Sequence, residues 1–223
     1  MHIEPGVVQG AKIILSYATA TAAAGYGARL AWQNIRARGA ASFLARSAIA
    51  TAAVFSFFEV LPHYPVGVSE VHLILGSTLF LILGAAPAAV GLALGLLMQG
   101  LLFAPFDLPQ YGMNLTTLLV PLFALQALAT RVIAPGTAYV DLKYRQALAL
   151  SVAYQGGVVA WVAFWAIYGQ GLAAGHAIAL FGSAYMLVVL IEPLVDLAIL
   201  AAAKTIRGLS GSGLVTRRLF HTA

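Results

Sequence analysis

The sequence predicts an all-α membrane protein, a polytopic bundle of about seven transmembrane helices. Of its 223 residues, 61% are hydrophobic and only 9% are charged, and the mean hydropathy is +0.92. Soluble domains carry about 25% charged residues. Long apolar runs alternate with short polar loops. We therefore expect one multi-pass domain over residues 1–223 in the cell inner (plasma) membrane, with residues 203–223 as a cytoplasmic tail.

Seven apolar segments approach the length of about 20 residues that crosses a bilayer. They are Gly10–Trp32, Phe43–Leu61, Val71–Ala86, Ala88–Phe103, Leu115–Thr130, Ala147–Tyr168 and Ala177–Ala202. The third and fourth are short, and a break that ends in Pro87 separates them. We expect both to cross as short helices wrapped by the others. A single re-entrant hairpin is the alternative.

The distribution of basic residues predicts the orientation. All but one of the 12 lysines and arginines flank alternate loops or the C-terminal tail, and Lys12 is the exception. The positive-inside rule then predicts an outer N-terminus and a cytoplasmic C-terminus. The outer face receives these histidines and acids: His2, His63, His72, His176, Glu4, Glu70 and Asp107. The net charge of +5 lies in short loops, so we expect contact with the lipid bilayer and no binding of nucleic acid.

Several kinds of site are excluded by what the sequence lacks. There is no cysteine, so thiolate metal sites, iron–sulfur clusters and disulfides are ruled out. No P-loop or catalytic motif is present, so we expect no ATP site in this chain. Imidazole, amine and carboxylate groups remain as candidate metal ligands.

The first two residues could form a chelate. The chain opens without the positive region of a signal peptide, and we expect Met1 to stay and carry a free amine. That amine, the backbone nitrogen of His2 and the imidazole of His2 can close fused five- and six-membered rings on one metal. A fourth nitrogen would complete the square plane associated with Ni(II) or Cu(II). The alternative is a chance histidine at a frayed terminus.

His72 could supply that fourth nitrogen. It lies one residue into the third apolar segment, where an ionisable group is a functional candidate. The alternative is an interfacial histidine whose side chain reaches the headgroups. Other polar residues could support the metal from behind its ligands: Asn114, Ser69, Glu70 and His63. Asn114 could instead cap the start of its helix.

Two acids stand inside the last apolar segment. Glu192 and Asp196 are four residues apart and share a helical face. They could relay protons or ions, pair with a base such as Arg131, or dock a partner near the cytoplasmic surface. We expect Glu192 to lie in the cytoplasmic half, far from His2. Glu192→Gln should then impair transport or assembly more than metal binding.

These motifs resemble the substrate-capture membrane subunit of the cobalt and nickel energy-coupling-factor ABC transporters, the CbiM/NikM type. The opening MHIEPG is similar to that family's MHI start. The runs VHLILGSTLFLILGAAPAAVGLALGLLMQGLLF, FDLPQYGMN and LIEPLVD resemble its later motifs. The sequence departs from the family pattern at Pro5, at Leu108-Pro109 and at Thr117.

The resemblance implies a metal site built from Met1, His2 and His72, with Ni²⁺ or Co²⁺ as the transported substrate. It also implies partners: a membrane coupling subunit, a cytoplasmic ATPase pair and a small accessory membrane subunit. Sequence alone does not choose between nickel and cobalt. The alternative from another class is a membrane-integral enzyme or assembly factor that uses the outer histidines for a permanent metal or haem.

Overall fold

The structure is a computed structural model that describes residues 3–205. In this part of the chain the main elements are seven α-helices and one two-stranded hairpin. The helices are α1 (Ile13–Arg38), α2 (Ala40–Glu59), α3 (Gly76–Leu83), α4 (Ala85–Leu102), α5 (Tyr111–Val132), α6 (Tyr144–Gln170) and α7 (Gly175–Thr205). The strands are β1 (Tyr64–Val66) and β2 (Ser69–Val71). Four 3₁₀ helices occur in the connections: η1 (Gly10–Lys12), η2 (Pro105–Gln110), η3 (Tyr139–Asp141) and η4 (Gly171–Ala174).

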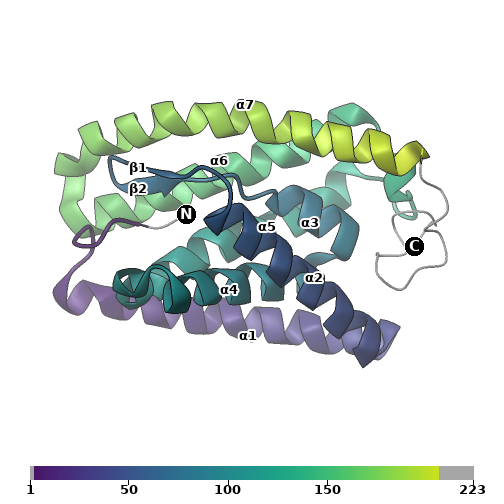
Figure 1. Cartoon of the computed structure of the whole chain (residues 1–223), viewed down its shortest axis with the longest axis horizontal. Coiled ribbons are helices and arrows are strands. Elements are labelled where there is room, and N and C mark those ends of the chain that lie inside the picture. The colour runs from purple at the N-terminus through teal and green to yellow at the C-terminus, as the bar shows by residue number, and fades with distance from the viewer. Residues whose placement is uncertain (1–2, 206–223) are drawn as a thin grey trace.

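The long helices lie roughly side by side and give the bundle two distinct ends (Figure 1). One end, here called the hairpin end, carries β1, β2, the chain before α1, η2 and η4. The opposite end carries the turn at Gly39 and η3. Basic residues occupy the last turns of three helices that finish at this opposite end: Arg36 and Arg38 on α1, Arg131 on α5 and Lys204 on α7.

Helix length and hydropathy confirm a membrane protein. Within residues 3–205, four stretches are long and apolar enough to cross a bilayer: Ala40–Glu59, Ala85–Leu102, Pro105–Val132 and Tyr144–Thr205. The last stretch contains both α6 and α7. Helix α1 has 26 residues, but its many small and polar residues keep it outside this apolar set.

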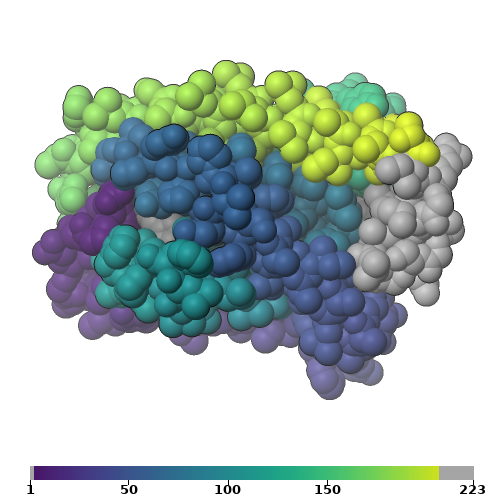
Figure 2. All heavy atoms as spheres, viewed as in Figure 1, coloured from purple at the N-terminus to yellow at the C-terminus, as the bar shows by residue number. Residues whose placement is uncertain are grey.

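The third apolar segment differs from the prediction. Of Val71–Ala86, only Gly76–Leu83 is one continuous helix, and it has eight residues. A helix of that length spans about 12 Å, against a hydrocarbon core of about 30 Å. Val71 belongs to β2, and residues 72–75 form neither helix nor strand. Six long helices and one broken segment therefore replace the predicted seven spans. Figure 2 shows the chain that follows α2 (blue) between α7 and the end of α4.

The fourth apolar segment is a regular helix, as predicted. Gly84, with a φ of 93°, joins it directly to α3. Helix α4 packs closely against α2. A Cβ added at Gly91 would come within 2.3 Å of the Cβ of Ala50. Small residues allow this close backbone approach, which is how apolar helices gain contact in lipid.

Candidate metal site

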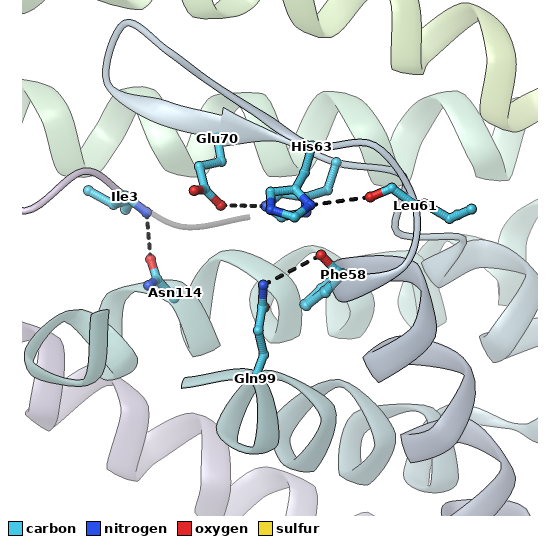
Figure 3. A network of polar contacts seen from close by, with 8 residues as sticks. Ile3, Phe58, Leu61, His63, Glu70, Gln99 and Asn114 are labelled. Atoms are coloured by element: carbon cyan, nitrogen blue, oxygen red, sulfur yellow. Dashed lines mark hydrogen bonds and ion pairs between the residues drawn. The ribbon is translucent and has the colours of Figure 1, made fainter. Parts of the chain in front are cut away.

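Ile3 is the first described residue, and three contacts fix the chain beside it. It forms an antiparallel bridge with Ser69 of β2. Its backbone N–H donates to Oδ1 of Asn114 on α5 at 2.8 Å. The next residue, Glu4, donates its N–H to the carbonyl of Val68 at 3.1 Å. The start of the chain is thus held as a third extended segment beside the hairpin (Figure 3).

Asn114 is a support for this segment and not a helix cap. It is the fourth residue of α5, and the N-cap position belongs to Gln110. The Asn114 side chain is buried, with 1% exposed. The capping alternative is therefore wrong, and Asn114 instead contacts the N-terminal segment at Ile3.

His72 lies inside the protein, next to Glu70. Only 1% of His72 is exposed, so the alternative of an interfacial side chain that reaches the headgroups is wrong. Its Nε2 is 2.8 Å from Oε2 of Glu70. A carboxylate accepts hydrogen bonds, so Nε2 carries the proton, and Nδ1 is the ring nitrogen with the chemistry to bind a metal. A carboxylate behind a histidine is the usual way to orient a metal-binding imidazole.

Aromatic rings surround His72. The ring of His63 stacks on it, with centroids 5.1 Å apart and planes 11° from parallel. Phe58 approaches at 5.3 Å. Nε2 of Gln99 on α4 donates to the carbonyl of Phe58 on α2 at 3.5 Å. His63 therefore contacts His72 through its ring face, in the region shown in Figure 3.

Acidic side chains collect at the hairpin end. Burial raises the pKa of Glu4, and the neighbouring charges of Glu70 and Asp107 raise that pKa further. Three carboxylates at this end make it attractive to a cation. A polar cleft lined by Glu4, Gly67 and Gln170 opens here.

The structure describes only part of the predicted ligand set. Within residues 3–205, no three His, Cys, Asp or Glu side chains are placed together to hold a metal ion. Met1 and His2, the other two predicted ligands, lie outside the described residues. Of the three predicted ligands, His72 is the one that lies among the described residues.

Glu192 and Asp196 do not have the surroundings that the sequence suggested. The carboxylate of Glu192 accepts the backbone N–H groups of Ile74 and Leu75, directly after the His72 region. Asp196 accepts the hydroxyls of Ser77 and Thr78. Arg131, the suggested partner, is exposed on α5. The expected separation of Glu192 from His2 involves a residue outside the described part of the chain, but Glu192 does contact the backbone two and three residues after His72.

Comparisons with known proteins agree with this description. A model of the CbiM family, described as the cobalt uptake substrate-specific transmembrane region, matches residues 2–208. A solved chain titled "Crystal Structure of an Truncated Transition metal Transporter" has a similar fold, with a TM-score of 0.64 over 91% of this chain and 95% of that one. The two share 18% sequence identity, so the likeness is one of fold. A search of curated proteins found no match.

The family match covers nearly the whole chain and agrees with its apolar helices. It favours a transport component over the membrane-enzyme alternative. The chain belongs to the CbiM family and is a substrate-specific transmembrane component of a cobalt uptake transporter.

Proposed function

We propose that this protein captures a divalent transition metal ion, Co²⁺ or Ni²⁺, with four nitrogen donors. These are the amine of Met1, the backbone nitrogen and imidazole of His2, and the imidazole of His72. Nitrogen donors suit both metals. Cobalt is the substrate that the family description names, and nickel is the second candidate.

The anchoring of Ile3 carries this proposal. The bridge between Ile3 and Ser69 ties the start of the chain to the strand that leads through Glu70 to His72. Two residues precede Ile3, and covalent geometry leaves their Cα atoms within about 8 Å of it. Both N-terminal donors can therefore reach the histidine region. Glu70, bonded to His72, would orient the fourth ligand.

We also propose that the hairpin end faces outward and the opposite end faces the cytoplasm. The acids at the hairpin end would attract the arriving cation. The bases on the last turns of α1, α5 and α7 follow the positive-inside rule. A membrane coupling subunit and a pair of cytoplasmic ATPases, with a small accessory membrane subunit, would complete the transporter.

The N-terminus gives the sharpest test of the metal site. Two forms of the purified protein, both tagged at the C-terminus, are titrated with Co²⁺ and with Ni²⁺. One form starts at Met1, and the other carries glycine and serine ahead of it. The extension turns the amine into an amide, which removes one donor and the five-membered ring. We expect affinity to fall by about 100-fold or more, beyond the usual effect of disturbing a residue behind a ligand.

Mass spectrometry of the native form checks that it keeps Met1 with a free amine. A matched extension at the C-terminus controls for added length and should leave the affinity unchanged. Equal metal affinity in the native and N-terminally extended forms would show that the terminal amine is not a ligand, and the proposed site would then be wrong.

The orientation can be tested separately, because the sequence contains no cysteine. Leu172→Cys lies in η4 at the hairpin end, where Leu172 is 89% exposed. Asp141→Cys lies in η3 at the opposite end. In intact cells a membrane-impermeant maleimide should label the first variant and not the second. The reverse pattern would contradict the proposed orientation.

A further inference from the structure

Glu192 of α7 is joined to the segment that carries His72. Its side chain is fully buried, with 0% exposed. One carboxylate oxygen, Oε1, accepts two consecutive backbone N–H groups, from Ile74 and from Leu75, the latter at 3.0 Å. These N–H groups lie just ahead of α3, whose N-cap residue Leu75 makes no side-chain cap. Glu192 thus supplies, from another helix, an acceptor for two backbone N–H groups at the start of α3 that the helix itself cannot satisfy.

The other side of the carboxylate is also held. Its Oε2 accepts a hydrogen bond from Nε2 of Gln155 on α6. The Gln155 carbonyl oxygen in turn accepts the hydroxyl of Tyr185 at 2.6 Å. This chain of contacts fixes the direction in which Glu192 points. The position of the accepting oxygen is therefore set by α6 and α7 together.

The backbone at this point has an unusual conformation. Leu75 has a φ of 53°, and it is the one residue other than glycine with a positive φ in the described chain. The left-handed region is unfavourable for a residue with a Cβ, and it persists where the surroundings enforce it. Two hydrogen bonds to one carboxylate oxygen are such an enforcement. Without Glu192, this turn could relax and would redirect the chain that precedes it.

His72 lies between two fixed points. On one side, Val71 pairs with Tyr64 in the hairpin. On the other side, Ile74 is bound to Glu192. Only His72 and Leu73 separate these anchors, so a shift of either anchor must move the imidazole. We infer that Glu192 is a positioning residue for metal capture, which holds the His72 imidazole in place through the backbone of Ile74 and Leu75.

Asp196 provides a matched control on the same helix. It is also buried, with 2% exposed, and it also accepts two hydrogen bonds near the start of α3. Its donors, however, are the side-chain hydroxyls of Ser77 and Thr78. These residues lie inside α3, on the far side of Leu75 from His72. Loss of Asp196 should weaken the packing of α3 without releasing the His72 segment.

The inference rests on the proposed metal site, and the test compares variants that all start at Met1. Glu192→Ala and Asp196→Ala are measured for Co²⁺ affinity, for the visible absorption spectrum of bound Co²⁺ and for unfolding temperature. Both should unfold at a lower temperature. Glu192→Ala should also raise the Kd by about 10- to 100-fold, as loss of a group that orients a ligand does, and should alter the spectrum. Asp196→Ala should keep a Kd and spectrum near those of the wild type.

Exchanging the side chains of Glu192 and Gln155 tests whether the hydrogen bonds, rather than the position of the negative charge, support metal binding. Glu192→Gln alone keeps an acceptor for Ile74 and Leu75 but sets two amide NH₂ groups against each other at Gln155. The double variant Glu192→Gln/Gln155→Glu restores a donor–acceptor pair and still accepts the hydroxyl of Tyr185. Its Kd should return toward that of the wild type, whereas the single variant should bind more weakly. If Glu192→Ala does not fold, these two variants still test whether Glu192 positions His72.

The inference would be overturned if Glu192→Ala and Asp196→Ala weakened Co²⁺ binding equally, or if folded Glu192→Ala bound like the wild type. A double variant no better than Glu192→Gln would also overturn it. The N-terminally extended protein distinguishes this failure from failure of the proposed site. If the extension abolishes binding while the variants at 192 bind normally, only the role of Glu192 is wrong.

Discussion

The third and fourth apolar segments look alike in the sequence and differ in the structure. Val71–Ala86 and Ala88–Phe103 are both short, and neither contains a charged residue. The fourth becomes α4, one continuous helix over Ala85–Leu102. The third keeps an eight-residue helix, preceded by four residues that form neither helix nor strand. The third segment, which carries His72, is therefore the less regular of the two.

The difference lies in where the backbone hydrogen bonds go. A continuous helix such as α4 satisfies its own N–H and C=O groups, as apolar surroundings require. The broken segment needs partners from elsewhere: Glu192 for Ile74 and Leu75, and Arg46 of α2 for the carbonyl of Leu83 at 2.6 Å. A carboxylate near the start of α3 and a guanidinium at its end also match the helix dipole. These partners from other helices favour a functional role for the irregular segment, which carries His72.

The largest effect should come from His72 itself. His72→Ala removes one of the four proposed nitrogen ligands but leaves the chelate of Met1 and His2, so residual binding is expected. We predict a fall in Co²⁺ affinity of about 100-fold or more, measured by titration. His63→Ala is the control, because the His63 ring stacks on that of His72 while its Nδ1 contacts the carbonyl of Leu61. An equal loss in both variants would mean that the aromatic cluster, and not the imidazole nitrogen, supports binding.

A substitution in the fourth apolar segment should lower the stability of the protein without changing its metal affinity. A Cβ at Gly91 would lie 2.7 Å from a backbone carbon of Ala50, so Gly91→Ala must push α4 away from α2. Overpacking of this kind costs about 1–3 kcal/mol, which thermal unfolding would detect. Co²⁺ affinity of the folded protein should stay unchanged, because α4 carries no proposed ligand.

Gly156→Ala provides the matched control for that prediction. Gly156 lies in α6, and nothing lies within 4 Å of an added Cβ. Alanine in a helix is favoured over glycine by about 0.5–1 kcal/mol, so this variant should be as stable as the wild type or more so. A Gly91→Ala protein that loses metal binding at full stability would break the contrast between the two segments.

The smallest effect should come from Asn114, which steadies the N-terminal segment through one hydrogen bond. Asn114→Ala leaves the N–H of Ile3 without this acceptor, a net cost of about 0.5–1.5 kcal/mol. Metal affinity should fall by roughly two- to tenfold, since 1.4 kcal/mol is tenfold in an equilibrium constant. Thr117→Ala, one turn of α5 away, bonds within its own helix and should have no such effect. Equal losses would point to a general effect on α5.

Most of the helices could be predicted from the sequence, because their apolar runs are local. Helices α2, α4, α5, α6 and α7 occupy the predicted segments. The break in the third segment could not be predicted in this way. The carboxylate that accepts the freed N–H groups belongs to Glu192, which lies 118 positions from Ile74 in the sequence. An apolar run predicts burial but does not say which distant side chain will replace its internal hydrogen bonds.

The candidate site could be predicted only in part, again because some of its contacts join residues far apart in the sequence. His72 stood out because an ionisable residue enters an apolar segment, and Glu70 lies two residues away. The contact of Ile3 with Asn114 joins residues 111 positions apart, and the sequence offered only a polar residue at the start of a helix. The sequence shows Glu192 as an acid inside an apolar helix, but helix position alone does not give its partners, which are Ile74, Leu75 and Gln155 rather than Arg131.

X-ray absorption on the Co²⁺-loaded protein tests the central claim most directly, because it counts imidazole ligands through their multiple scattering. The wild-type protein with its native start should show nitrogen donors that include two imidazoles, from His2 and His72. His72→Ala should show one. An imidazole count that is the same in both proteins, or coordination by oxygen alone, would contradict the claim that the broken third segment delivers a metal ligand.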